Sequence, residues 1–250
     1  MKNIWIIGSS SGIGLDLLKI YLKLNYKIIA SSRTIESSEE ILTLQKKYPQ
    51  KLTLLNIDVS NTTSVEKSVQ KLFSIFDKID ITIFNAAVYE VMRVEKWDIK
   101  HFEEMTNINY LGALRVTTSL IPFYEKQGFG RLVFNASLSS YFGLPYGGGY
   151  SASKAALVNF AQSIQAELIV KNIEIQIINH GFVQTRLTQK NNFEMPDLIT
   201  SEEAAKNIYE GVNRKYSFEI RFPFKISLFL RLMAILPYKI SLIINKKLLK

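Results

Sequence analysis

The chain has 250 residues, 47% of them hydrophobic, and carries a formal net charge of +9 at pH 7. This length and apolar content favour one folded domain with a large core over a disordered or fibrous protein. Because there is no cysteine and there are only two histidines, disulfides, a thiolate nucleophile, cysteine-ligated metals and a histidine-rich metal site are excluded, and we expect no metal.

The excess of positive charge lies near the end of the chain. After Glu219 there is no acidic side chain, whereas seven basic ones follow it: Arg221, Lys225, Arg231, Lys239, Lys246, Lys247 and Lys250. The rest of the chain is close to balanced, which indicates a basic tail on an ordinary enzyme body and no nucleic-acid-binding face. The first apolar run is too short for a signal peptide, so we expect a cytoplasmic protein.

Strands and helices are expected to alternate along the chain. The apolar periodicity predicts a strand at 3–8, a helix at 12–26, a strand at 27–32, a helix at 36–48, a strand at 51–60, a helix at 61–76, a strand at 79–87, a helix at 98–126, a strand at 130–137, a helix at 150–170 and a strand at 173–181. This alternation predicts an α/β fold, a single-domain Rossmann-type doubly wound parallel sheet that binds ligands beyond the carboxyl ends of its strands.

The last residues form a separate region, so we divide the chain into a body, residues 1–222, and a basic C-terminal extension, residues 223–250. Pro237, Arg231 and Lys239 interrupt any apolar span of about 20 residues, which argues against a transmembrane helix and predicts two short amphipathic helices. Two interpretations of these helices are equally favoured. The helices contact an anionic membrane surface as a peripheral element, or they cover a cleft or pack on a second subunit.

Three glycines occupy the turn between the first predicted strand and its helix. Gly8 permits a tight turn, Gly12 lets a pyrophosphate approach the backbone, and Gly14 allows the helix to pack closely on the strand. The helix N-terminus presents free N–H groups to an anion. At the first junction of a βαβ unit, such a turn predicts a dinucleotide site in the body. The other cofactor contacts expected in this turn are Ser10, Ser11 and Ile13.

The end of the second predicted strand indicates which dinucleotide is bound. An enzyme that prefers NAD normally carries an acidic residue here to hold the ribose hydroxyls, and this sequence has Ser32 and Arg33 instead. An arginine can pair with a 2′-phosphate through two hydrogen bonds, so NADP(H) is favoured and NAD(H) is the alternative. The competing interpretation is that Arg33 is only a solvated loop charge.

Tyr150 and Lys154 are four residues apart, so they share one face of the predicted helix. Free tyrosine has a pKa of about 10 and is a poor proton donor or acceptor at neutral pH unless its anion is stabilised. We expect the Lys154 ammonium, together with the positive nicotinamide ring, to lower the pKa of Tyr150. The pair therefore predicts acid–base chemistry.

The motifs "YSASK", "GSSSGIG", "NAA" and "INYLGAL" occur in an order that resembles the short-chain dehydrogenase/reductase family over residues 1 to about 190. The resemblance implies that Tyr150 is the catalytic acid/base and that Lys154 lowers its pKa and holds the nicotinamide ribose. It also implies that Ser137 hydrogen-bonds the substrate oxygen, with Ser139 and Ser140 as nearby competitors. Asn109 matches the asparagine that helps to hold a water-mediated proton relay to the lysine.

The same resemblance implies further cofactor contacts and exposes departures from the family pattern. The expected contacts are Asp58 and Val59 beside the adenine, Asn85, Ala86 and Ala87 in the turn after the fourth strand, and Phe182, Val183 and Thr185 near the nicotinamide amide. Ile7 replaces a threonine, Ala87 replaces a glycine, and His180 replaces a proline. The last change predicts a less rigid loop on the nicotinamide side.

Together these features predict an NADP(H)-dependent oxidoreductase that moves a hydride between the nicotinamide and a carbonyl or secondary alcohol. Membrane contact by residues 223–250 would favour a lipophilic substrate. The resemblance also implies a homo-oligomer. Two alternatives from other classes remain: a non-catalytic NADP(H)-binding redox sensor, and a membrane-associated scaffold.

Overall fold

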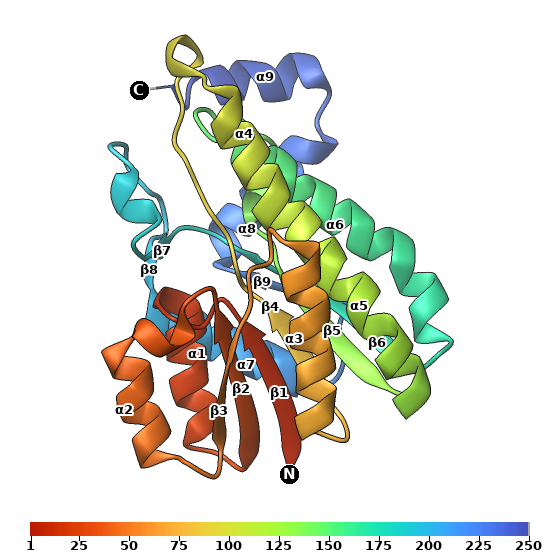
Figure 1. The fold of residues 1–250 in the computed structure, drawn as a ribbon. Helices are drawn as coiled ribbons and strands as arrows, with labels where there is room; N and C mark the ends of the chain where they lie inside the picture. Colours follow the sequence, from red (N-terminus) through yellow and green to blue (C-terminus); the bar gives the residue numbers. More distant parts are fainter. Residues whose placement is uncertain (250) are drawn as a thin grey trace.

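The computed structural model describes residues 1–249, which form a seven-stranded parallel sheet with helices on both faces (Figure 1). The strand order is β3-β2-β1-β4-β5-β6-β9. The strands are β1 (Lys2–Ile7), β2 (Tyr26–Ser32), β3 (Leu52–Asn56), β4 (Ile81–Phe84), β5 (Gly130–Asn135), β6 (Ile173–His180) and β9 (Glu219–Phe222). This architecture confirms the predicted doubly wound α/β fold.

The helices divide between the two faces of the sheet. On one face lie α1 (Gly12–Leu22), α2 (Glu39–Lys47) and α7 (Ser201–Asn213), and on the other lie α3 (Thr62–Ile75), α5 (Gly112–Gln127) and α6 (Gly148–Ile169). Successive side chains of a strand point to opposite faces, so Ile4 and Ile6 of β1 enter one core and Trp5 and Ile7 enter the other. Two covered faces explain why these strands are apolar along their length.

The predicted helix at 98–126 is three segments in the structure. They are α4 (Ile99–Met105), a π-helical turn η3 (Thr106–Leu111) and α5. Asn109 lies in the π-helical turn and is buried. Periodicity cannot reveal such a turn because it adds a single residue to the helical repeat.

The sequence interpretation placed no element between residues 182 and 222, where the structure has several. These are a second, two-stranded sheet of β7 (Val183–Gln184) and β8 (Ile199–Thr200), followed by α7 and β9. A signal for α7 was available, because Thr200 and Glu203 form a capping box at its start. By contrast, β9 has only four residues and is recognisable through its pairing with β6.

The C-terminal extension forms the two predicted helices, α8 (Phe224–Ile235) and α9 (Tyr238–Lys246), with Pro237 between them. Arg231 of α8 forms an ion pair with Glu219 of β9, which attaches the extension to the edge of the sheet. Figure 1 shows α9 beyond the carboxyl ends of the strands, at the end of the molecule far from the N-terminus. Within residues 1–249 no helix is both long and apolar enough to cross a membrane. The division at residue 222 remains a prediction.

Four short 3-10 helices complete the described secondary structure. They are η1 (Ile35–Ser37), η2 (Val94–Lys96), η4 (Leu138–Ser140) and η5 (Thr188–Lys190). Both η4 and η5 lie beyond the carboxyl ends of sheet strands, in the part of the chain that forms the site described next.

Candidate active site

A cavity of about 800 Å³ lies beyond the carboxyl ends of the central strands, where the strand order changes direction between β1 and β4. It joins the glycine turn to the face of α6 that carries Tyr150 and Lys154. The candidate residues that line it are Gly8, Ser10, Ser11, Gly12, Ile13, Ser32, Arg33, Asp58, Val59, Asn85, Ala86, Ala87, Ser137, Tyr150, Lys154, Phe182, Val183 and Thr185. Gly14 and Asn109 do not line it.

The glycine turn packs so closely on its neighbours that side chains are excluded. Gly8 has φ +86°, and a Cβ there would lie 2.6 Å from the backbone nitrogen of Ala86. Its carbonyl oxygen accepts a hydrogen bond of 2.7 Å from Nδ2 of Asn85. A Cβ at Gly14 would lie 2.1 Å from that same oxygen. Gly14 therefore lets α1 pack against the turn, as the sequence predicts, and it does not line the cavity. Its contribution to cofactor binding stays a prediction.

Replacing Gly14 with alanine should lower the free energy of unfolding by about 3 kcal/mol, because backbone atoms and not a flexible side chain occupy the space. Urea unfolding followed by circular dichroism measures this. Gly148→Ala is the matched control, since no atom of the described chain lies within 4 Å of its added Cβ. That variant should differ from the wild type by no more than about 1 kcal/mol. Equal stability of the two variants would contradict the packing role.

The end of the cavity near β2 and β3 is charged. Arg33 is exposed and lines the cavity. Asp58 accepts hydrogen bonds from the hydroxyl of Ser60 at 2.7 Å and from its backbone N–H at 2.9 Å, and these hold the pKa of the Asp58 carboxyl below its usual value. The positive charges of Arg33 and Arg115 act in the same direction. This end therefore presents both signs of charge.

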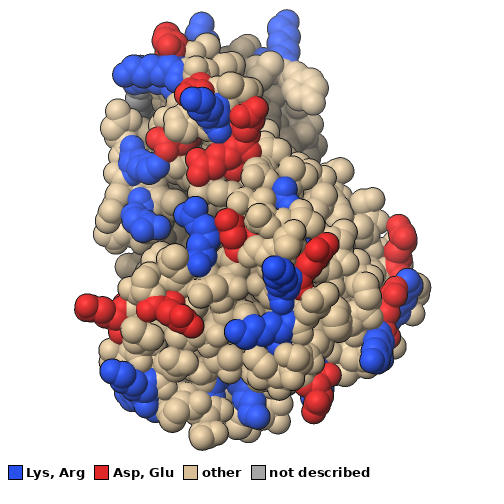
Figure 2. Space-filling model, viewed as in Figure 1, with Lys and Arg blue, Asp and Glu red and all other residues tan. Residues whose placement is uncertain are grey.

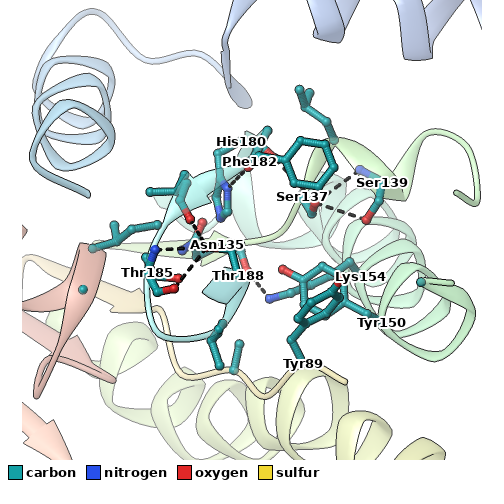
Figure 3. Close-up of a pocket in the computed structure, with 18 of the residues that line it drawn as sticks. Tyr89, Asn135, Ser137, Ser139, Tyr150, Lys154, His180, Phe182, Thr185 and Thr188 are labelled. Atoms are coloured by element: carbon teal, nitrogen blue, oxygen red, sulfur yellow. Dashed lines mark hydrogen bonds between the residues drawn. The ribbon is translucent and has the colours of Figure 1, made fainter. Parts of the chain in front are cut away.

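Tyr150 and Lys154 face the same cavity from one side of α6 (Figure 3). Lys154 is only 2% exposed, and its Nζ donates a hydrogen bond of 2.6 Å to the carbonyl oxygen of Asn135 at the end of β5. The Nζ lies 5.6 Å from the centroid of the Tyr150 ring. The spacing of four residues on α6 and the hydrogen bond to the Asn135 carbonyl together place the Lys154 amine beside the Tyr150 ring.

The electrostatics of this pair differ from the sequence expectation. Burial raises the pKa of Tyr150, the nearby Tyr89 raises it further, and the Ser137 hydroxyl opposes the shift. Burial also lowers the pKa of Lys154 to about 7, so its ammonium is only partly populated at neutral pH. The expected lowering of the Tyr150 pKa by Lys154 is not seen, because burial raises this pKa and leaves the Lys154 amine only partly charged. The contribution expected of the nicotinamide ring stays a prediction.

Three serines follow β5, and the structure distinguishes them. Ser137 lines the cavity, and its hydroxyl accepts hydrogen bonds from the backbone N–H and the hydroxyl of Ser139, at 3.2 and 3.1 Å. Ser139 also lines the cavity, whereas Ser140 does not and donates to Oδ1 of Asn179 at 3.3 Å. Ser140 is therefore outside the cavity, and of the two serines that line it, Ser137 is the one whose hydroxyl opposes the rise in the pKa of Tyr150.

Asn109 lies behind the cavity wall. Its Oδ1 accepts from the backbone N–H of Val88 at 2.8 Å, and its Nδ2 donates to the Val88 carbonyl at 2.9 Å and to the hydroxyl of Ser153 at 3.1 Å. The side chain thus holds the segment after β4 against α6. Its contribution to a proton relay stays a prediction.

Tyr89 and His180 also line the cavity, and the sequence interpretation gave neither a role in the site. The ring of Tyr89 lies edge-on to that of Tyr150, with centroids 4.9 Å apart, and its hydroxyl donates to Asn191 at 2.9 Å. Burial lowers the pKa of His180 to about 4, so the ring is neutral, and its Nδ1 donates to the carbonyl of Gly181 at 2.7 Å. His180 is therefore a half-buried, neutral residue of the cavity wall at the end of β6. No local motif marks Tyr89.

The extension contributes to the cavity as well. Ile226, Phe229 and Leu230 of α8 form part of the wall, and Leu248 after α9 joins them. This is the arrangement expected if the extension covers a cleft. The outward faces of both helices remain exposed, so the membrane interpretation is still open.

Comparison with known proteins agrees with the geometry. The chain is 28% identical over 193 residues to dehydrogenase/reductase SDR family protein 7-like of Drosophila melanogaster, a match that covers 75% of this chain and 59% of that protein. It is 25% identical over 232 residues to an uncharacterized oxidoreductase of Myxococcus xanthus, which covers 93% of this chain and 91% of the relative.

Solved structures show the same fold at low sequence identity. A short chain dehydrogenase of Burkholderia cenocepacia superposes with a TM-score of 0.83 at 20% identity, covering 100% of both chains. An alcohol dehydrogenase of the archaeon Thermococcus sibiricus superposes with a TM-score of 0.79 at 23% identity, covering 89% of this chain and 96% of that one. The model of the family described as "short chain dehydrogenase" matches residues 2–196, which include the glycine turn and the Tyr150–Lys154 pair. The chain belongs to the short-chain dehydrogenase family.

Proposed function

We propose that this protein is an NADP(H)-dependent oxidoreductase that moves a hydride between the nicotinamide and a carbonyl or secondary alcohol, with a lipophilic substrate. One observation carries the proposal. Tyr150, Lys154 and Ser137 line the same cavity as the glycine turn, so a proton donor and a dinucleotide can meet there. Family membership makes an oxidoreductase of this class the expected activity.

The residues of the cavity fit a dinucleotide. Ser11 stands at the N-cap of α1, yet its side chain makes no capping hydrogen bond, and the first turn of the helix holds no acidic residue. The N–H groups at this end of α1 are therefore suited to a pyrophosphate. Ser32 and Arg33 line the cavity where a 2′-phosphate would be held. The Burkholderia structure is described as a complex with NADP, and the related ElxO as having NADP bound.

The bound nicotinamide would supply or accept the hydride. The protein's own residues handle the proton. Burial keeps the Tyr150 phenol protonated at neutral pH, which is the form that donates to a developing alkoxide in carbonyl reduction. Ser137 would hold the substrate oxygen next to that phenol. Lys154, with a pKa of about 7, is matched to return a proton to the tyrosine near neutral pH.

A redox sensor would need the cofactor site alone. Here the cavity also contains a phenol, an amine and a hydroxyl at the place where a substrate oxygen would bind, which favours turnover. The scaffold alternative likewise leaves these groups without a purpose.

The deciding experiment is a turnover screen. Purified full-length protein is mixed with NADPH and a panel of lipophilic ketones and aldehydes, or with NADP⁺ and the corresponding alcohols, and absorbance of the reduced cofactor is followed. The proposal expects substrate-dependent consumption that Tyr150→Phe abolishes. Tight NADPH binding with no consumption across the panel would instead support the sensor.

Arg33→Gln should raise the KM for NADPH by about 10- to 100-fold, because it removes the charged partner of the 2′-phosphate. The KM for NADH should change less than threefold. The two cofactors serve as each other's control in steady-state assays of the same variant. An unchanged KM for both cofactors would mean that Arg33 is only a solvated loop charge, and an equal rise in both would mean that it does not read the 2′-phosphate.

A further inference from the structure

The outward face of α8 is apolar. Four large side chains are strongly exposed there: Phe224 (68%), Leu228 (57%), Leu232 (53%) and Ile235 (81%). At about 100° per residue they fall within an arc of about 80°, so they form one continuous stripe along the helix. A surface helix normally turns this kind of stripe toward the core.

This helix uses a different face for the core. Ser227, Leu230 and Met233 are buried, and their spacing of three places them on the side opposite the stripe. The exposed stripe is therefore not the packing face of α8. Phe229 and Leu230 line the active-site cavity, whereas the four stripe residues do not.

The next helix also exposes apolar side chains. Tyr238, Leu242 and Ile243 of α9 are exposed, while Ser241 is buried against the body. We call seven of the exposed apolar side chains of both helices the tail face: Phe224, Leu228, Leu232, Ile235, Tyr238, Leu242 and Ile243. Figure 1 shows α9 at the end of the molecule, where a flat partner can reach it.

Basic side chains alternate with the tail-face residues along both helices, and one of them, Lys225, also lines the cavity. Lys225, Lys239 and Lys246 are exposed, and none forms an ion pair with any residue in the described part of the chain. Arg231 differs, because its partner is Glu219. No acidic residue follows Glu219 in the sequence. Elsewhere acidic and basic side chains are interspersed, as the lower part of Figure 2 shows.

We propose that the tail face docks on an anionic phospholipid surface. Such a surface offers hydrocarbon to the exposed leucine, isoleucine and aromatic side chains and phosphate groups to the lysines at the same depth. A second copy of this chain is the poorer occupant. A twofold contact through the tail face would bring the lysines of both copies together without an acidic partner.

Docking would place the active site beside the lipid. Helix α8 carries the tail face on one side and lines the cavity with Phe229 and Leu230 on another. On the proposed function, a lipophilic carbonyl substrate would enter from the bilayer. This consequence rests on the proposed activity, whereas docking itself does not.

Co-sedimentation with vesicles tests docking without any activity measurement. The full chain is mixed with vesicles of phosphatidylcholine alone, or with about 30% phosphatidylglycerol. We expect at least tenfold stronger partitioning onto the anionic vesicles, weakened by 0.5 M salt. Absent binding, or equal binding to both vesicles, overturns the proposal.

Variants distinguish binding through the tail face from nonspecific hydrophobic binding to vesicles. Leu228→Gln with Leu232→Gln and Ile235→Gln should reduce partitioning at least tenfold and leave the melting temperature unchanged, because all three side chains are exposed. The matched control replaces three exposed apolar residues elsewhere, Ile75→Gln with Ile99→Gln and Val170→Gln. If that control loses as much binding, the tail face is not the docking surface.

A double variant that removes two lysine charges tests the electrostatic contribution to binding. Lys239→Gln with Lys246→Gln should weaken anionic binding by roughly 10- to 30-fold. Lys67→Gln with Lys71→Gln removes the same charge from the solvent-facing side of α3 and should leave binding unchanged. Sedimentation velocity tests the remaining possible occupant of the tail face, a second copy of this chain. A wild-type dimer that the triple glutamine variant converts to monomer, without vesicle binding, would make the tail face a self-interface and overturn the proposal.

The two proposals can fail separately. Turnover of a water-soluble carbonyl by wild-type protein that ignores vesicles would overturn docking and keep the oxidoreductase. Vesicle binding by a protein that never consumes NADPH would do the reverse.

Discussion

Tyr150→Phe should reduce kcat by about 10²- to 10⁴-fold, the range that a lost general acid accounts for. The dissociation constant for NADPH should change little, because only the hydroxyl is removed from the cavity wall. Steady-state kinetics and fluorescence titration of NADPH measure the two quantities. Stability should stay within about 1 kcal/mol of the wild type, because the aromatic ring remains in place and the Ser137 hydroxyl keeps its hydrogen bonds from Ser139.

The neighbouring phenol provides the matched control. Tyr89 lies edge-on to Tyr150 in the same cavity, and Tyr89→Phe removes a hydroxyl that bonds Asn191. This variant should retain at least about a tenth of wild-type kcat, because its phenol transfers no proton in the proposed reaction. If Tyr89→Phe is inactive and Tyr150→Phe is active, the two tyrosines have been assigned the wrong way round.

Lys154→Met should stabilise the protein at pH 7 while removing activity. Burial lowers the pKa of Lys154 from 10.5 to about 7, which corresponds to a cost of roughly 5 kcal/mol to the folded state near and below pH 7. Methionine avoids that cost but leaves the Asn135 carbonyl without its donor, which costs about 1–3 kcal/mol. Because desolvation of the ammonium outweighs the lost hydrogen bond, we expect a net gain of about 2 kcal/mol in the free energy of unfolding.

The gain should depend on pH with a defined sign. Between about pH 7 and pH 10.5 the unfolded chain keeps the Lys154 proton that the folded chain has lost, so wild-type stability rises with pH across this window. Lys154→Met removes this rise, so its advantage should disappear below pH 10, and at pH 10 the wild type should be the more stable protein. Urea unfolding at pH 7 and at pH 10 measures both values.

An exposed lysine controls for the substitution itself. Lys67→Met on α3 should leave the stability difference between pH 7 and pH 10 as in the wild type. A variant at Lys154 that is less stable than wild type at both pH values would show that the ammonium is well solvated or paired in the fold, contrary to its 2% exposure.

Short sequence patterns were enough to predict much of the candidate site. Gly8 and Gly14 are required by a turn of a few residues, and Tyr150 and Lys154 share a helix face through a spacing of four, so both features could be predicted without knowing the fold. Tyr89 could not, because its place beside Tyr150 results from the packing of the loop after β4 onto α6. The four-residue strand β9 likewise depends on its partner β6.

Sequence by itself determined the order of strands and helices up to residue 181, the glycine turn and the candidate residues for proton transfer, since each depends on contacts between residues close along the chain. Tertiary structure alone decided the protonation of those residues. Burial is a property of the whole packed molecule, and here it raises the pKa of Tyr150 and lowers that of Lys154, against the expectation from charge alone. Packing also decided which side of α8 is left exposed, because only the folded body determines which face of that helix it covers.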